Sequence, residues 1–186
     1  MANITTPEFR VSYPNVFKPK MNELSNKEEF SLVALFPKNA DLSKLKKAVD
    51  EAIVKKWGAD KAKWPKNIRL PFRDQGERIE DAKSKNKPAP AGHEAGAVYL
   101  NLKSNMKPGL VDAGMNEIID ETQFYAGCFA RASVSVYCYD QKGNRGVSIG
   151  LQHIQKLRDG ESLGGRPRVE EAFEPIQQAS GDIFND

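Results

Sequence analysis

Residues 124 to 139 read FYAGCFARASVSVYCY, and this run decides the fold. Every even position is apolar and most are small, whereas the odd positions hold aromatic, polar and glycine residues. Side chains that alternate in this way point to opposite faces of a β-strand. Small apolar residues suit the interior of a tightly closed barrel, so the even positions are predicted to face the core. These positions are Phe124, Ala126, Cys128, Ala130, Ala132, Val134, Val136 and Cys138.

Other short segments also carry strand patterns. In residues 8–13, Phe9, Val11 and Tyr13 share one side, which predicts a half-buried strand that ends at Pro14. Alternation or a continuous apolar run predicts further strands at 30–36, 68–73 and 97–103, and a hairpin that turns at 140–144 and returns through 147–151.

One long helix is predicted between these strands. Residues 41–57 place apolar residues at helical spacing, with Asp41 suited to begin the helix and Gly58 to end it. Residues 74–96 are polar and contain several Lys and Pro residues, which predicts a long exposed loop, and residues 115–122 predict a short helix or turn. Six strands around one helix indicate a small, mostly antiparallel β-barrel.

The charge of the chain is unevenly distributed. The 186 residues carry a net charge of +3, but residues 169–186 contain five acidic residues and no Lys or Arg. Residues 1–168 therefore carry 28 positive and 20 negative charges, a net +8. We expect a folded domain over 1–168 and a flexible acidic tail over 169–186, and opposite charges on one chain can compete for one partner.

Several functional classes lack support in the sequence. No apolar run is long enough to span a membrane, and the first residues resemble no secretion signal, which predicts a cytoplasmic protein without membrane contact. Cys128 and Cys138 are predicted to be reduced thiols in the interior, and His93 and His153 surface or loop residues. Neither a metal site nor a cofactor is expected, because no known metal, nucleotide or hydrolase motif is present.

The odd positions of residues 124–139 indicate a binding surface. They hold four aromatic residues and an arginine with small residues between them, and unpaired bases stack on rings while cations follow phosphates. The alternative is that some of these rings pack under the helix or the long loop. Neighbouring strands add Arg and Lys on their outer faces. The predicted DNA-binding residues are Arg69, Arg73, Tyr99, Lys103, Tyr125, Phe129, Arg131, Tyr137 and Tyr139.

These patterns favour a protein that binds single-stranded DNA without sequence preference and is not an enzyme. Lys83, Lys85 and Lys87 are further candidates for contacts, although a solvated loop is the better explanation for them. The alternative is a β-barrel adaptor or structural protein of a virion. A third hypothesis, a metal-dependent nuclease, would use the acidic cluster of residues 74–81, for which a solvated turn is the better explanation.

The chain also resembles the OB-fold single-stranded DNA-binding proteins of tailed bacteriophages. The matching segments are RVSYPNVF at 10–17, FPK at 36–38, YAGCFARA at 125–132, GVSIGL at 146–151 and RDGE at 158–161. The resemblance implies an OB barrel with an acidic C-terminal tail. It also implies that the protein coats DNA in the host cytoplasm during phage replication and recombination.

The resemblance also suggests that the tail recruits replication or recombination proteins. We expect the contacts from its last residues, Asp182, Ile183, Phe184 and Asp186. Tails of this kind commonly finish on an aromatic residue, whereas here Asn185 and Asp186 follow Phe184. The resemblance does not say which aromatic residues stack on bases, and homo-oligomeric or cooperative assembly on DNA stays open.

Overall fold

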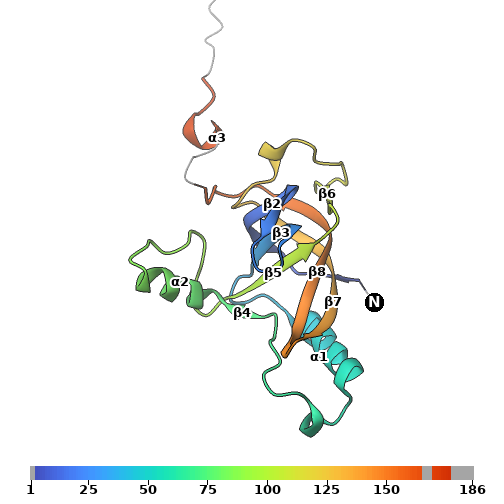
Figure 1. The fold of residues 1–186 in the computed structure, drawn as a ribbon. Helices are drawn as coiled ribbons and strands as arrows, with labels where there is room; N and C mark the ends of the chain where they lie inside the picture. Colours follow the sequence, from blue (N-terminus) through green and yellow to red (C-terminus); the bar gives the residue numbers. More distant parts are fainter. Residues whose placement is uncertain (1–2, 165–168, 177–186) are drawn as a thin grey trace, which may run out of the picture.

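The computed structural model describes residues 3–164 and 169–176 and contains a closed β-barrel (Figure 1). The strands are β1 (Ile4–Thr5), β2 (Phe9–Asn22), β3 (Lys27–Leu35), β4 (Arg73–Asp74), β5 (Val98–Ser104), β6 (Gly109–Val111), β7 (Phe129–Gln141) and β8 (Asn144–Arg158). The α-helices are α1 (Ser43–Trp57), α2 (Gln75–Ser84) and α3 (Val169–Ala172), and 3₁₀ turns are found at Lys61–Lys63 and Glu121–Gln123.

Five strands form the barrel in the order β2-β3-β5-β8-β7, and β7 pairs again with β2 to close the ring. The β5–β8 pair is parallel and the other pairs in the ring are antiparallel. This is the five-stranded Greek-key barrel of the OB-fold. Strands β1 and β6 pair with the middle parts of β7 and β8, and β4 adds a short edge beside β5. The predicted fold class is confirmed.

The alternation of residues 124–139 places most of the predicted side in the core. Ala126, which precedes the strand, is only half-buried, and Ser135 on the opposite side is buried. Phe124, Cys128, Ala130, Ala132 and Val134 are at most 2% exposed, and Val136 and Cys138 pack against them. The strand itself begins only at Phe129, later than the pattern suggested. The chain turns before that residue, because Gly127 has a φ of +115° and lies against the Glu161 carbonyl, where a Cβ would clash.

The helix α1 lies across one end of the barrel, against β7 and β8 (Figure 1). Its apolar side buries Leu45, Val49 and Ile53. The backbone N–H of Ser43 donates to the Asp41 carboxylate at 3.0 Å, and Gly58 ends the helix with φ +89° and an N–H bond to the Val54 carbonyl. The predicted helix and its C-terminal end are confirmed. Its start differs: the helix begins at Ser43, two residues later than predicted, and Leu42 rather than Asp41 occupies the N-cap position.

Two predicted elements were wrong. Residues 68–73 do not form a strand: apart from one bridge between Arg69 and Gly146, pairing begins at Arg73. Pro71 interrupts the alternating run, since it has no N–H to donate to a neighbouring strand.

Residues 74–96 are not a continuous loop, because α2 occupies their first half. The helix begins where the Asp74 carboxylate accepts the Gly76 N–H at 2.7 Å. Asp74 and Glu77 have the three-residue spacing that marks a helix N-terminus, a signal that the sequence contained.

The strand β2 differs from its predicted pattern in the direction of one ring. Phe9 and Val11 are fully buried as expected, but the pairing with β3 shifts between Ser12 and Asn15. The extra residue forms a β-bulge, and Tyr13 adopts a φ of +44°. Tyr13 is consequently 55% exposed rather than in the core.

The chain leaves the barrel after β8 and crosses its outer surface. The Leu163 side chain packs on Val33, Leu35 and Tyr99, on the outside of β3 and β5. Helix α3 is exposed along its whole length. The four tail residues expected to contact partners, Asp182, Ile183, Phe184 and Asp186, lie outside the described residues.

Candidate nucleic-acid interface

A row of cations and apolar side chains crosses the outer face of the barrel at right angles to the strands. Successive neighbours in the pairing are Arg158 on β8, Phe129 on β7, Arg10 on β2, Leu35 on β3, Tyr99 on β5 and Arg73 on β4. Three of the predicted DNA-binding residues, Arg73, Tyr99 and Phe129, therefore lie in one row although they are far apart in the chain.

A groove follows β2, β3 and β5 beside this row. Its cavity volume is about 210 Å³, and Asn15, Ser31 and Lys103 occupy adjacent positions across it. Lys103 lies 3.7 Å from Glu29, and the lysine side chain remains 45% exposed. Further residues that line the groove are Tyr13, Lys20, Met21, Asn22, Leu32, Val33, Asn101 and Leu102. The outer face of these central strands is where OB-folds bind oligonucleotides.

The predicted residues Tyr137 and Tyr139 lie beyond Lys103, where β8 contains glycines. Lys103 pairs with Gly150, and a Cβ on Gly150 would lie 3.5 Å from the Tyr137 ring. A Cβ on Gly146 would lie 2.8 Å from the Tyr139 ring, so this glycine likewise leaves room for the ring. The two rings thus lie across β8 because neither glycine has a side chain. Tyr137 is 40% exposed.

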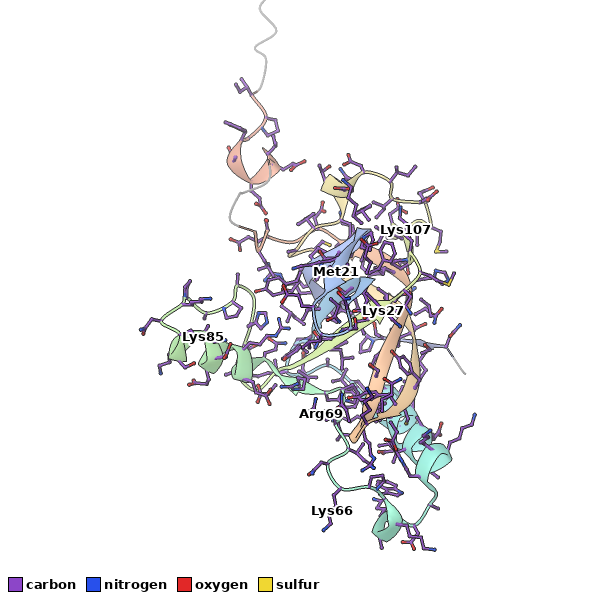
Figure 2. All side chains as sticks on the ribbon, in the orientation of Figure 1. Met21, Lys27, Lys66, Arg69, Lys85 and Lys107 are labelled. Atoms are coloured by element: carbon purple, nitrogen blue, oxygen red, sulfur yellow. The ribbon has the colours of Figure 1, made fainter. Side chains whose placement is uncertain are left out.

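Arg69 joins this group from the segment before β4. Its carbonyl accepts the Val147 N–H at 2.9 Å, which holds the residue beside the β7–β8 hairpin, and its side chain is exposed (Figure 2). The groove is therefore extended at one end by a group of four predicted residues: Lys103, Tyr137, Tyr139 and Arg69.

Two predicted residues lie elsewhere. The Tyr125 hydroxyl bonds to Asp159 and to the Gly160 carbonyl, and its ring faces Lys156 at 5.4 Å, which are packing contacts around the end of β8. Arg131 bonds to Gln155 in the part of the β7–β8 ribbon that β1 and β6 flank. The alternation in the sequence showed which residues of β7 point outward. It did not show where around the barrel each of these residues lies.

Arg78 was not predicted, because residues 74–96 were expected to be a loop. It lies on α2 with its guanidinium 4.4 Å from the centre of the Tyr99 ring and 5.6 Å from the centre of the Tyr13 ring. Its Nη2 also approaches the Asn101 side-chain oxygen at 3.5 Å. Tyr99 is consequently only 5% exposed, since Arg78 and Leu163 cover it. Only a correct prediction of α2 could have revealed this arrangement.

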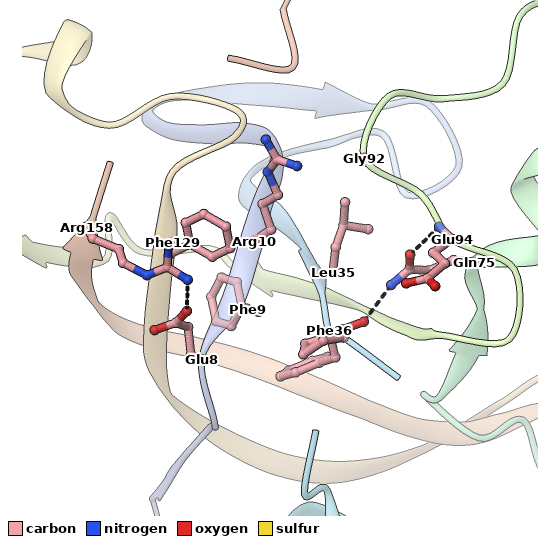
Figure 3. A pocket seen from close by; sticks show the side chains of 11 residues that line it. Glu8, Phe9, Arg10, Leu35, Phe36, Gln75, Gly92, Glu94, Phe129 and Arg158 are labelled. Carbon is pink, nitrogen blue, oxygen red and sulfur yellow. Dashed lines mark hydrogen bonds and ion pairs between the residues drawn. The ribbon is translucent and has the colours of Figure 1, made fainter. Parts of the chain in front are cut away.

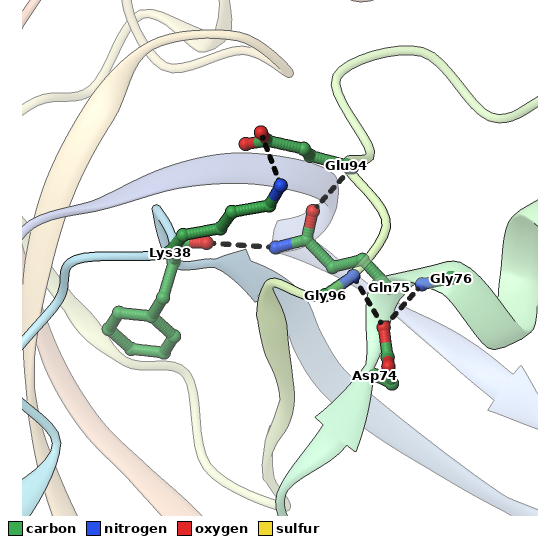
Figure 4. Close-up of polar contacts among 7 residues, drawn as sticks. Lys38, Asp74, Gln75, Gly76, Glu94 and Gly96 are labelled. Atoms are coloured by element: carbon green, nitrogen blue, oxygen red, sulfur yellow. Dashed lines mark hydrogen bonds and ion pairs between the residues drawn. The ribbon is translucent and has the colours of Figure 1, made fainter.

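A buried amide fixes α2 against the barrel (Figure 4). Gln75 is 1% exposed, and its side-chain nitrogen donates to the carbonyls of Phe36 at 3.0 Å and Val98 at 2.8 Å. Its side-chain oxygen accepts the Glu94 N–H at 2.8 Å. The Asp74 carboxylate adds a second tie through the Gly96 N–H. These bonds hold the start of α2, and with it Arg78, at the edge of the groove.

A second pocket of about 300 Å³ opens beside Phe129 (Figure 3). The Phe129 ring lies between two guanidinium groups, Arg158 at 3.7 Å and Arg10 at 5.6 Å. Arg158 also pairs with Glu8 at 2.7 Å, and Arg10 donates to the Glu161 carbonyl at 2.7 Å. This end of the row presents cations rather than an open ring.

Burial shifts the pKa of three groups near these surfaces, raising that of the half-buried Cys138 thiol. It lowers the pKa of His93, which packs near Tyr99, and the nearby Arg78 adds to the effect, against a backbone hydrogen bond to Ala91 that raises it. The His93 Nε2 is buried without a hydrogen-bond partner in the described part of the chain. Burial raises the pKa of the Cys128 thiol, which is a free, buried cysteine as expected.

The acidic cluster of residues 74–81 is arranged on a helix and not in a solvated turn. Asp74 caps α2, Glu77 bonds Arg73 at 2.8 Å, and Asp81 pairs with Lys85 at 2.9 Å. Within residues 3–164 and 169–176, no three His, Cys, Asp or Glu side chains are grouped so as to hold a metal ion. No helix in those ranges is long and apolar enough to cross a membrane.

Comparison with known proteins identifies the family. Residues 2–184 match the family described as Enterobacter phage Enc34, ssDNA-binding protein. A curated relative, putative protein p50 of Acyrthosiphon pisum secondary endosymbiont phage 1, is 28% identical over 183 residues that cover 91% of each chain.

Solved structures share the fold. The single-stranded DNA-binding protein of bacteriophage Enc34 in complex with ssDNA is 21% identical, with a TM-score of 0.65 over 87% of this chain and 89% of that chain. The single-stranded DNA-binding protein gp2.5 of bacteriophage T7 is 12% identical, with a TM-score of 0.60 over 90% of this chain and 98% of that chain.

The barrel and its basic, aromatic outer face define an OB-fold binding protein. The chain belongs to the Enc34-type family of phage single-stranded DNA-binding proteins. The predicted family and the predicted class, a DNA-binding protein and not an enzyme, are confirmed. Membership also favours this function over the alternative of a virion adaptor.

Proposed function

We propose that the protein coats single-stranded DNA without sequence preference during phage DNA replication and recombination in the host cytoplasm. The DNA strand follows the groove of β2, β3 and β5 and continues past Lys103 to Tyr137 and Tyr139. The observation that carries the proposal is the in-register row Asn15, Ser31, Lys103 and Gly150, which joins the groove to the two tyrosines.

The chemistry of this surface suits any sequence. Rings offer a stacking face to every base, and Lys and Arg contact the phosphates that all bases share. The proposed direct contacts from the sequence are Arg69, Arg73, Lys103, Tyr137 and Tyr139. Tyr99 and Phe129 are proposed to act through the arginines that cover their rings. Tyr125 and Arg131 lie outside this surface and are left out of it.

The acidic tail is proposed to regulate access and to recruit partners. Leu163 packs on the outer face of β3 and β5, so the chain that leads to the acidic tail leaves the barrel beside the proposed DNA surface. Tethering gives the −5 segment a high effective concentration at the basic surface, where it competes weakly with DNA. Once DNA displaces it, the same segment is free to bind replication or recombination proteins.

A titration of labelled oligonucleotides tests the proposed function. Affinity for oligo(dT) should exceed affinity for a duplex of the same length and fall steeply as salt increases, because both phosphate contacts and stacking contribute. Oligo(dT) and a mixed sequence without secondary structure should bind alike. Equal affinity for duplex and single strand at moderate salt would contradict the proposal.

A further inference from the structure

We infer that Tyr13 is a base-stacking residue that a strained bulge in β2 turns out of the core, with Arg78 as the cation beside it. The inference rests on the proposed function and adds a contact that the sequence assigned to the opposite face. Three observations carry it: the backbone conformation, the exposed ring and the unpaired cation.

The backbone of Tyr13 is held in a conformation that aromatic residues rarely adopt. Its φ of +44° lies in the left-handed region, where a bulky side chain is a genuine outlier. The Asn15 amide donates to the Tyr13 carbonyl at 3.2 Å, and pairing resumes at Asn15 opposite Ser31, so both sides of the bulge are anchored. Strain of this kind persists where the surroundings over-determine it and is often found at binding sites.

The bulge changes which side of the sheet receives the ring. With unbroken alternation after Phe9 and Val11, Tyr13 would point into the barrel. The extra residue instead directs it outward, while Val16 returns to the core at 2% exposure. At 55% exposure, Tyr13 is the most exposed large aromatic residue of residues 3–164, and it lines the groove.

Arg78 lies next to this ring without a carboxylate partner. In the described part of the chain, no ion pair joins Arg78 to an acidic residue, whereas the neighbouring Arg73 is paired with Glu77. Its guanidinium remains closer to Tyr99 than to Tyr13, at 4.4 Å against 5.6 Å. A base can therefore stack on Tyr13 while Arg78, supported by Tyr99, contacts the adjoining phosphate.

Replacing Tyr13 with glycine removes the ring and also relieves the backbone strain, so an effect on DNA binding can be told apart from a loss of stability. Gly adopts positive φ without steric cost, so Tyr13→Gly should melt no lower than the wild type, yet bind oligo(dT) about 5- to 150-fold more weakly, the loss expected for one stacked base. Tyr13→Phe keeps a stacking ring and should retain most of the affinity that Tyr13→Gly loses. The matched control is Met115→Gly, because Met115 also has positive φ (+68°) and 70% exposure but lies away from the groove. It should keep full affinity.

Crosslinking gives a readout that stability does not affect. Wild-type protein irradiated with oligo(dT) containing 5-iododeoxyuridine should yield an adduct that mass spectrometry maps to Tyr13. Unchanged affinity of Tyr13→Gly, a lower melting temperature of that variant, or no adduct at Tyr13 would each overturn the inference. If wild-type protein fails to prefer single strands, the proposed function fails; if it prefers them and the Tyr13 results disagree, only this inference fails.

Discussion

The guanidinium of Arg158 lies 3.7 Å from the centre of the Phe129 ring, and Arg10 faces the same ring at 5.6 Å. The odd face of the strand led to the expectation of a ring open to bases. In the structure, the ring instead supports two cations that belong to one row on the barrel surface. This arrangement leads to a specific prediction for Phe129.

Phe129→Leu keeps an apolar side chain but removes the π face beneath Arg158. We expect affinity for oligo(dT) to fall about 2- to 10-fold, the range of a partly exposed cation–π contact, because Arg158 loses its support. Fluorescence anisotropy measures the change. A loss as large as that of Tyr13→Gly would instead mean that a base stacks directly on Phe129.

Lys103 and Arg131 form a matched pair for testing the path of the DNA. Lys103→Ala and Arg131→Ala each remove one exposed positive charge, but only Lys103 lines the groove. Lys103→Ala should weaken binding and reduce the slope of log affinity against log salt by about 1, as expected for one lost phosphate contact. Arg131→Ala should change both quantities less. Equal effects would place the DNA on both sides of the barrel.

Gln75 should contribute strongly to stability through its buried amide. Gln75→Leu leaves the carbonyls of Phe36 and Val98 and the N–H of Glu94 without this partner. We expect the free energy of unfolding to drop by about 2–4 kcal/mol in urea titrations, because unsatisfied buried polar groups are costly. Arg73→Gln is a control that removes only an exposed ion pair and should cost little. A stable Gln75→Leu variant would show that α2 is held by other contacts.

The stability of the protein should fall in mild acid because of His93. Burial lowers the pKa of His93 in the folded state below its ordinary value of 6.5. The unfolded chain therefore binds a proton first as the pH falls through 6.5, which shifts the equilibrium towards unfolding. The melting temperature should decrease from pH 7.5 to 5.5, and His93→Phe should weaken this dependence. His153→Gln, at an exposed position on β8, should retain it. An unchanged profile in His93→Phe would contradict the prediction.

Removal of the tail should strengthen binding of single-stranded DNA. Deletion of residues 169–186 removes five negative charges tethered to the basic domain, so affinity should rise most at low salt, where screening is least. The deletion should also abolish partner recruitment without lowering the melting temperature.

A full-length variant separates charge from chain length in this test. Glu170→Gln, Glu171→Gln and Glu174→Gln together keep the tail but neutralise three charges, and should reproduce part of the gain in affinity. A truncated protein that binds no better and melts lower would mean that the tail packs on the domain and stabilises it.

The sequence alone determined the barrel, its main helix and the inner face of β7. The alternation of residues 124–139 has the period of a strand, and its small apolar side fits only a tightly closed interior. The local signal for the C-terminal end of α1 was also sufficient, because a terminal glycine acts on adjacent backbone groups. The Asp74–Glu77 spacing carried a comparable signal for α2, which the polar composition of that stretch obscured.

Only the tertiary structure decided which outward residues share one surface. Arg73, Tyr99 and Phe129 meet because β4, β5 and β7 belong to one ring, whereas Arg131 faces elsewhere on the same strand as Phe129. A period of two assigns inside and outside but not the position around a closed barrel, which depends on the register of every strand pair. The outward turn of Tyr13 depends likewise on a bulge in the pairing with β3, which the alternation of residues 8–13 by itself does not reveal.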